Sequence, residues 1–140
     1  MAHGNLSNVQ VGDQLPELEL PPITREQLAL FAGASGDHNP IHIDIDFARR
    51  AGMPDVFAHG MLGMAWLGRL ITDWAPQAQL RKFDVRFMGI THLGNAIRCS
   101  GEVVEKLQVD GEDCVRLQVQ SQNQFGQKKI VGEALIALPR

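Results

Sequence analysis

The sequence predicts an α+β fold in which an antiparallel sheet wraps around one buried central helix. The segment from Gly60 to Trp74 has helical length, and its first half, Gly-Met-Leu-Gly-Met-Ala-Trp-Leu-Gly, has no polar face. That pattern is typical of a helix buried on all sides. The residues after it alternate between apolar and polar with a period of two, as in strands with one buried face. A sheet with a single apolar face can bury that face by curling around such a helix.

The N-terminal part predicts a short strand and then a helix. The strand is expected over 17–20, where Pro21-Pro22 end it. Thr24 and Gln27 have the spacing of a capping box, so a helix is expected to follow to about Ala34. Its side chains expected to face the core are Leu28, Phe31 and Ala32.

A second short helix is expected between this one and the central helix. Asp44 or Asp46 can cap it, and it should run through 47–51. Gly52 would close it in a C′ role, and Pro54 prevents its continuation.

Strands are expected to fill most of the second half. The expected strands are 82–87, 97–103, 115–119 and 129–138, joined by turns at Gly94-Asn95, at Asp110-Gly111 and over 123–126. The last strand is apolar on both faces, so it should lie inside the sheet. In the central helix, Gly63 and Gly68 are poor helix formers and predict close packing against backbone or a ligand.

Length and composition indicate one soluble domain over residues 1–140. The net charge is −3 and the charges are dispersed; no basic patch indicates nucleic acid and no basic amphipathic helix indicates a membrane surface. Residues 1–10 lack the apolar core of a signal peptide, and the apolar run 61–71 is too short to span a bilayer. We therefore expect a cytoplasmic protein. The Cys and His residues do not have the clustered spacing of a metal site, so we expect no bound metal. We also expect no cofactor.

The two cysteines are expected to be reduced. Cys99 and Cys114 flank the turn at Asp110-Gly111. In a hairpin about that turn, Cys99 lies opposite the region of Ser121 and Cys114 opposite the region of Lys106. That separation is too large for a disulfide. Two packed thiols fit a reducing compartment.

A candidate catalytic loop has the sequence Ala-Ser-Gly-Asp-His-Asn-Pro-Ile-His-Ile-Asp over 34–44. Its glycine and proline prevent one continuous helix, so Asp37 and His42 are held by a shaped loop. A rigid loop carrying an acid and a base suits general acid–base chemistry. On these residues alone an alternative stays open, in which Asp37 and Asn39 are turn residues and His42 is a satisfied core histidine.

A second stretch, Phe-Ala-His-Gly-Met-Leu-Gly-Met over 57–64, adds to the first. Together they give S-G-D-x-N-P-I-H-x-D … A-H-G-M-L, which resembles the MaoC-like hydratase and dehydratase family, including the (R)-specific enoyl-CoA hydratases. The resemblance runs from Val11 to the last strand around 132–134. It looks closest to the catalytic subunits of MaoC-type dehydratases from type II fatty-acid synthesis. It implies a hot-dog fold, with the sheet wrapped around the central helix.

The resemblance also implies a reaction and a site. The reaction is reversible hydration of a trans-2-enoyl thioester to an (R)-3-hydroxyacyl thioester, carried by coenzyme A or by acyl carrier protein. Asp37 and His42 would hold the reacting water, and the Gly60 N–H would bind the thioester carbonyl at the helix start. Asn39 would orient Asp37 or its loop. Alternatively, Gly60 only lets the chain turn sharply into the helix.

The other histidines and Gly68 are not expected to take part in the reaction. His59 is expected to be structural, donating a hydrogen bond near the helix start. His3, His38 and His92 are expected to be exposed loop histidines. The better-known (R)-hydratases carry a Ser nine residues after the His of H-G-M; here that position is Gly68, which affects local support or pocket shape and not the reaction class.

Two other functions compete with a hydratase. A hot-dog acyl-CoA thioesterase generally needs a carboxylate on or beside the central helix, but the first acid in that helix is Asp73, near its far end. A non-catalytic acyl-thioester-binding subunit of a hydratase heterodimer would be expected to lack Asp37 or His42. A half-wrapped sheet leaves an edge strand uncovered, so we expect a homodimer or higher oligomer, or a heterodimer with a related subunit. The acyl chain, the carrier, the pathway and the division of roles between Asp37 and His42 stay open.

Overall fold

The computed structural model of the protein describes residues 6–140, so His3 lies outside the described residues. In chain order the elements are η1 (Leu6–Asn8), β1 (Leu18–Glu19), α1 (Arg25–Ser35), η2 (Pro40–His42), α2 (Ile45–Arg50), α3 (Gly60–Trp74), η3 (Gln77–Gln79), β2 (Leu80–Phe87), β3 (Arg98–Val109), β4 (Glu112–Gln122) and β5 (Lys128–Ala137). None of the described helices is both long and apolar enough to span a membrane.

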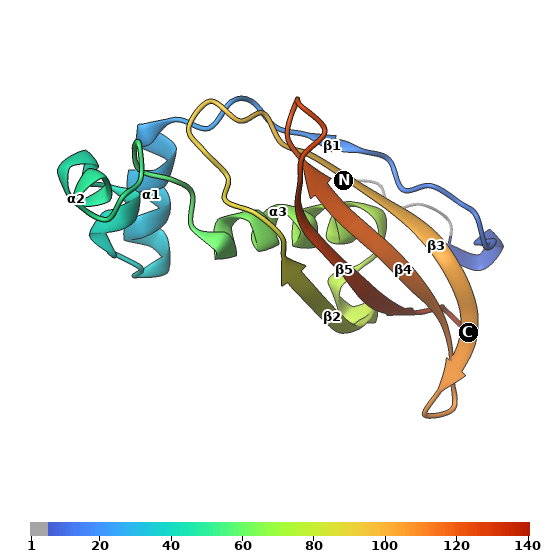
Figure 1. The fold of residues 1–140 in the computed structure, drawn as a ribbon. Helices are drawn as coiled ribbons and strands as arrows, with labels where there is room; N and C mark the ends of the chain where they lie inside the picture. Colours follow the sequence, from blue (N-terminus) through green and yellow to red (C-terminus); the bar gives the residue numbers. More distant parts are fainter. Residues whose placement is uncertain (1–5) are drawn as a thin grey trace.

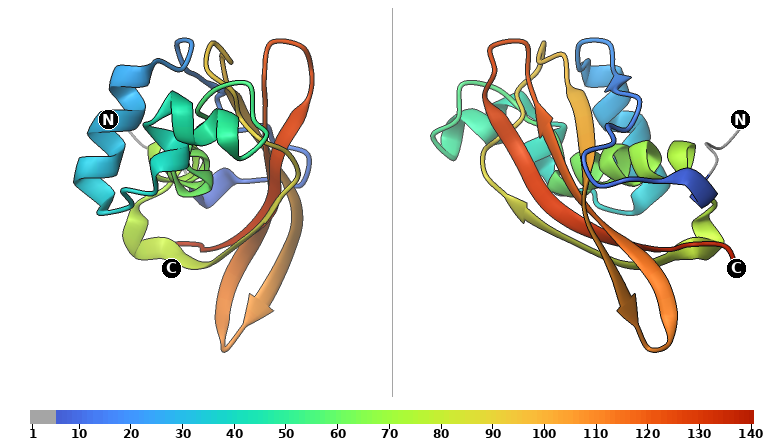
Figure 2. Two further views of the ribbon diagram at one scale, coloured as in Figure 1. Left: turned by 60° about the vertical axis from the view of Figure 1, so that its left-hand side comes forward. Right: turned by 90° about the vertical axis from the view of Figure 1, so that its right-hand side faces the viewer.

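The five strands form one antiparallel sheet in the order β1-β3-β4-β5-β2. The sheet is strongly twisted and curls around α3, which lies across its concave side (Figures 1 and 2). This arrangement confirms the predicted hot-dog fold. It also confirms that β5 lies inside the sheet, between β4 and β2.

The core forms between α3 and the concave side of the sheet. Leu67, Leu70 and Ile71 of α3 are at most 1% exposed and belong to the same apolar cluster as Val103 and Leu117 of the sheet. Successive strand side chains point to opposite faces, so every second strand residue reaches this cluster. Burial of this apolar surface is the main source of the fold's stability.

One side of α3 stays open in the single chain. Met61 is 58% exposed, and Ala65 and Arg69, one and two turns further along, are also exposed. The prediction of a helix buried on all sides is therefore wrong for the single chain, because its sheet covers the helix from one side only.

The two helix glycines differ. A Cβ on Gly63 would lie 2.8 Å from Cδ1 of Ile130 in β5, so α3 and the sheet approach closely there, as predicted. A Cβ on Gly68 would lie 3.7 Å from the Phe83 ring, an ordinary contact distance. Packing within the chain therefore does not require glycine at position 68.

The helices before α3 form as their capping residues predict. The Thr24 hydroxyl accepts a hydrogen bond from Gln27 N–H at the start of α1, and Leu28 and Ala32 are buried. Asp44 caps α2 by accepting from two main-chain N–H groups. Both helices lie at the N-terminal end of α3 (Figure 1), where they enclose the segment that carries Asp37 and His42.

The cysteines are free and buried, as predicted. In the β3–β4 register Cys99 pairs with Ser121, and Cys114 pairs with Leu107. Burial raises the pKa of the Cys99 thiol to about 12, so it is protonated and unreactive in the folded protein.

Candidate functional site

The loop after α1 is shaped by side chains that bond to the main chain. Gly36 ends α1 with φ of 80°, a left-handed conformation that favours glycine. The Ser35 hydroxyl accepts from Asp37 N–H (3.1 Å), Asp37 Oδ1 accepts from Asn39 N–H (3.2 Å), and Asn39 Oδ1 accepts from Ile41 N–H (3.1 Å). This series of short-range bonds fixes the loop without a hydrophobic core.

His42 lies at the end of this loop, in η2, with its ring buried. Its Nδ1 donates a hydrogen bond to the main-chain carbonyl of Phe57 (2.8 Å), and its ring packs edge-on against the Phe57 ring at a centroid distance of 5.2 Å. When Nδ1 carries the proton, Nε2 of the neutral ring is an acceptor. The structure thus gives His42 the tautomer that a general base requires.

His59 lies directly before α3 and contacts the loop at two places, Asp37 and His42. Its Nε2 donates to the main-chain carbonyl of Asp37 (3.1 Å), and its ring stacks on the His42 ring with centroids 4.0 Å apart and planes 27° apart. The Phe31 ring of α1 packs against its other side in an edge-on contact at 4.8 Å. Burial lowers the pKa of His59, and the neighbouring His42 lowers it further. The expectation that His59 makes a structural hydrogen bond near the helix start is confirmed.

The side chains of Asp37, His42 and His59 come together, and one potential metal-ligating atom from each lies within 4.8 Å of the other two. Two imidazoles and a carboxylate are a ligand set that could hold a cation. However, Nδ1 of His42 and Nε2 of His59 already bond to carbonyl oxygens. Each ring keeps one further nitrogen, Nε2 of His42 and the buried, unpaired Nδ1 of His59. Of these groups, Nε2 of His42 and the exposed Asp37 carboxylate suit proton transfer.

Gly60 begins α3 and lines an apolar pocket of about 390 Å³. The pocket is formed by Phe57, Ala58, Gly60, Phe87, Met88, Gly89, Ile90, Thr91 and Ile130. The first turn of α3 has no acidic side chain to offset the positive end of the helix dipole. A Cβ on Gly60 would lie 3.2 Å from the Phe87 ring, so a larger side chain here would crowd the pocket at the start of α3.

A buried lysine supports the pocket wall. Lys129 of β5 is 6% exposed and donates from Nζ to the main-chain carbonyl of Ile90 (2.7 Å). Its burial lowers the pKa of the ammonium group. The wall is also held by Ala58 N–H, which donates to the carbonyl of Thr91 (2.9 Å).

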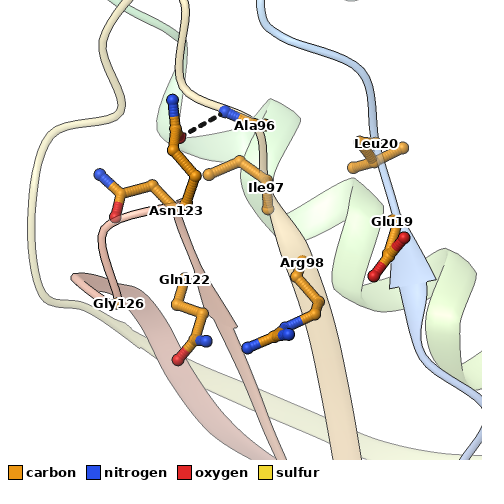
Figure 3. Close-up of a pocket in the computed structure, with 9 residues that line it drawn as sticks. Glu19, Leu20, Ala96, Ile97, Arg98, Gln122, Asn123 and Gly126 are labelled. Carbon is orange, nitrogen blue, oxygen red and sulfur yellow. Dashed lines mark hydrogen bonds between the residues drawn. The ribbon is translucent and has the colours of Figure 1, made fainter.

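A second pocket, of about 420 Å³, lies far from this chemistry. It is lined by residues of β1, β3, the end of β4 and the loop after β4, and Glu19 of β1 lies beside Arg98 of β3, its partner in the strand register (Figure 3). Gln124 bridges its end by accepting from Ala96 N–H and donating to the carbonyl of Gly94. It contains none of the residues that the motifs single out.

The structure brings the sequence-predicted site residues to one end of α3. Asp37, Asn39 and His42 share one loop, and His59, which stacks on His42, directly precedes Gly60. His38 and His92 are exposed, as expected.

Sequence reasoning missed the carbonyl of Phe57 as the partner of His42, and it missed Lys129 and the 88–91 wall. These depend on contacts between distant segments. A lone lysine in a strand expected to be buried was the one available signal.

Comparison with known proteins agrees with this geometry. The MaoC like domain matches residues 8–124. The unliganded R-hydratase PhaJ1 from Pseudomonas aeruginosa superposes with a TM-score of 0.84 and 31% identity, over 97% of this chain and 86% of that one.

Two sequence relatives are partial matches. The mitochondrial 3-hydroxyacyl-[acyl-carrier-protein] dehydratase of Arabidopsis thaliana is 32% identical over 64% of this chain and 52% of its own length. The fatty acid synthase beta subunit TOXC of Cochliobolus carbonum is 32% identical over 76% of this chain but only 5% of its own length. The match with this chain thus spans about half the length of the dehydratase and a small part of the length of TOXC. By its domain match and its fold, the chain belongs to the MaoC-like dehydratase family.

Proposed function

We propose that the protein is a hydro-lyase that reversibly hydrates trans-2-enoyl thioesters to (R)-3-hydroxyacyl thioesters, on coenzyme A or acyl carrier protein. One observation carries the proposal: the acid–base pair, Asp37 and His42, lies beside the N-terminal end of α3, which begins at Gly60. The family supports hydration and dehydration chemistry, and the relatives named above include an R-hydratase and a 3-hydroxyacyl-[acyl-carrier-protein] dehydratase.

In the proposed mechanism one water lies between Nε2 of His42 and the Asp37 carboxylate. Asn39 N–H holds Oδ1 of Asp37, which leaves the other carboxylate oxygen for the water. The pair takes one proton from the water as its oxygen bonds to C3 of the enoyl group, and it returns one proton to C2. Water is thus added across the double bond, and the pair ends in its starting state.

The thioester carbonyl would be bound at the start of α3. Negative charge builds on its oxygen as C3 is attacked, and the Gly60 N–H with the positive helix end would stabilise that charge. The adjoining pocket is mainly apolar, with Phe87, Met88 and Ile90 in its wall, which suits part of an acyl thioester.

Hydrolysis of the thioester is less well supported. A thioesterase of this fold generally uses a carboxylate on or beside the central helix, and the first acidic residue of α3 is Asp73. Asp73 lies thirteen residues after Gly60 in α3, which is about 20 Å along the helix, and it is 3.9 Å from Arg69. A non-catalytic acyl-thioester-binding role is also less well supported, because the chain keeps both Asp37 and His42.

We also propose that the active form is a dimer, either of identical chains or with a related subunit. β2 lies at the edge of the sheet and pairs only with β5 on its other side. Antiparallel pairing of two β2 edges centred on Val85 would place Asp84 opposite Arg86 of the second chain and Phe83 opposite Phe87. Both pairs are favourable across strands. Sedimentation at micromolar concentration should show a dimer, and a clean monomer would contradict this part of the proposal.

The function is tested by loss of the conjugated thioester absorbance when the protein is mixed with trans-2-enoyl-CoA substrates of increasing chain length. We expect hydration, with the (R)-3-hydroxyacyl thioester as product. A thiol reagent in a parallel assay reports free coenzyme A. Free thiol without loss of the double bond would instead support a thioesterase, and no reaction with any chain length or carrier would contradict catalysis.

A further inference from the structure

The His59 side chain contacts both members of the acid–base pair. It holds the main chain of Asp37 through Nε2 and the ring of His42 through stacking. We infer that His59 is a positioning residue, which sets the separation and orientation of Asp37 and His42. The inference rests on the proposed hydratase function, because it assigns His59 a part in the same reaction.

The helix start does not account for a histidine at this position. His59 is the N-cap residue of α3, yet its side chain makes no capping hydrogen bond. Its Nδ1 is buried and has no hydrogen-bond partner among the described residues. A buried, unpaired nitrogen is unfavourable, and an apolar side chain would avoid it. The histidine is therefore better explained by the two contacts that it makes than by packing alone.

Burial also favours the neutral form of His59 by lowering its pKa. Its Nε2 carries the proton that bonds to the Asp37 carbonyl, so a second proton would have to go to the unpaired Nδ1. The charged groups that face it are Asp37 and His42 from the loop, while α1 contributes only the uncharged Phe31 ring. A positive His59 would oppose any positive charge that His42 gains when it accepts a proton. A neutral ring in this place supports His42 without competing for that proton.

Two substitutions separate the contacts of His59. His59→Phe keeps a ring beside His42 but cannot donate to the Asp37 carbonyl. His59→Gln loses the ring but keeps a donor near the position of Nε2. The matched control is His38→Gln: His38 is an exposed histidine of the same loop, and its ring also bonds to a loop carbonyl, that of Gly36.

The readout is kcat and KM on a trans-2-enoyl-CoA, with circular dichroism to check folding. We expect His59→Phe to lower kcat by about 10- to 100-fold while KM stays within about twofold, because misplaced catalytic groups slow the chemical step. His59→Gln should recover most of that loss, and His38→Gln should match the wild type. In an Asp37→Asn background, His59→Phe should add little, because it acts through Asp37. Wild-type kcat in a folded His59→Phe variant would overturn the inference, and so would equal losses in the Phe and Gln variants.

A second measurement does not depend on activity or on the folding of a variant. Nitrogen-15 NMR of the histidine rings in the wild-type protein should show His59 neutral, with the proton on Nε2, at pH 6, where a free histidine is mostly charged. A charged His59 at that pH, or a proton on Nδ1, would overturn the inference. If the protein hydrates no enoyl thioester but His59 shows this tautomer, the proposed function fails while the geometry inferred for His59 stands.

Discussion

The sheet and the loop over 36–44 are held together in different ways. Val103, Leu117 and Val119 of the sheet are at most 1% exposed, and their neighbours along each strand face solvent. In the loop Asp37 and Asn39 are exposed, and short-range hydrogen bonds from side chains to main-chain N–H groups determine its shape. Stability thus resides mainly in the buried sheet, and the proposed chemistry resides in a polar loop attached to one end of it. Substitutions in the two regions should therefore have separable effects.

The largest effect on stability is expected at Gly132 in β5. A Cβ there would lie 2.2 Å from the Asp84 carbonyl oxygen and 2.9 Å from Cα of Val85, so Gly132→Ala must push β2 off the sheet. Overpacking costs about 1–3 kcal/mol, and we expect about 3 kcal/mol here because backbone is in the way. Denaturant unfolding measures the loss. Gly33→Ala is the control, because nothing lies within 4 Å of the added methyl group. A Gly132→Ala variant as stable as the wild type would contradict the register of β2 and β5.

A large effect on catalysis is expected at Gly60. Gly60→Val would fill the space between the start of α3 and the Phe87 ring and block the proposed carbonyl site. Loss of an oxyanion donor typically costs about 10²–10³ in kcat, and we expect a fall of about 100-fold in kcat/KM. Unfolding stability should change little, because Phe87 is 50% exposed and can move. Gly68→Ala, in the same helix with ordinary contact distances, should keep wild-type activity. A folded Gly60→Val variant with full activity would show that the carbonyl binds elsewhere.

The same two regions differ in how much of each the sequence could predict. The period-two pattern located β2, β3, β4 and β5, because it records burial on one face, although β3 extends to Val109, beyond the expected end at 103. The helix α3 begins and ends at the predicted Gly60 and Trp74. The contact of His59 with His42 and the bond from Lys129 to Ile90 were not predictable. They join segments far apart in the chain, and no local pattern determines which side chains meet there.

A matched pair of capping substitutions compares the start of α1 with the loop over 36–44. Thr24→Ala removes the bond to Gln27 N–H at the start of α1, and should cost about 1 kcal/mol in unfolding free energy with no change in rate. Asn39→Ala removes the bond to Ile41 N–H in the loop, and should cost about 1 kcal/mol or less. It should, however, slow hydration by about tenfold, because it loosens the turn between Asp37 and His42. Thermal unfolding and initial rates measure both. Equal rates in the two variants would mean that the loop does not need this cap.

The smallest expected effect is on the pH dependence of stability. Burial lowers the pKa of His59 in the folded protein, whereas an unfolded histidine titrates near 6.5. Below about pH 6.5 the unfolded chain therefore binds more protons at this residue than the folded chain, so stability falls as the pH falls. The melting temperature of the wild type should drop more steeply between pH 7 and pH 5 than that of His59→Gln. Parallel curves would show that His59 is not held neutral by the fold.

The central claim is that Asp37 and His42 act as one catalytic unit on a shared water. The measurement is the initial rate on a short trans-2-enoyl-CoA for Asp37→Asn, His42→Gln and the double variant, with their alanine counterparts, and with circular dichroism to confirm folding. General acid–base groups contribute about 10²–10⁴ in rate. Because loss of either residue breaks the same proton path, we expect the rate of each single variant to fall by about 10²–10⁴. The rate of the double variant should be similar to the rates of the single variants. Unfolding stability of the Asp37 variants should stay within about 1 kcal/mol of the wild type, since this side chain is exposed. Near-wild-type activity in either single variant would contradict the mechanism, and a double variant far slower than both would show that the two residues act independently.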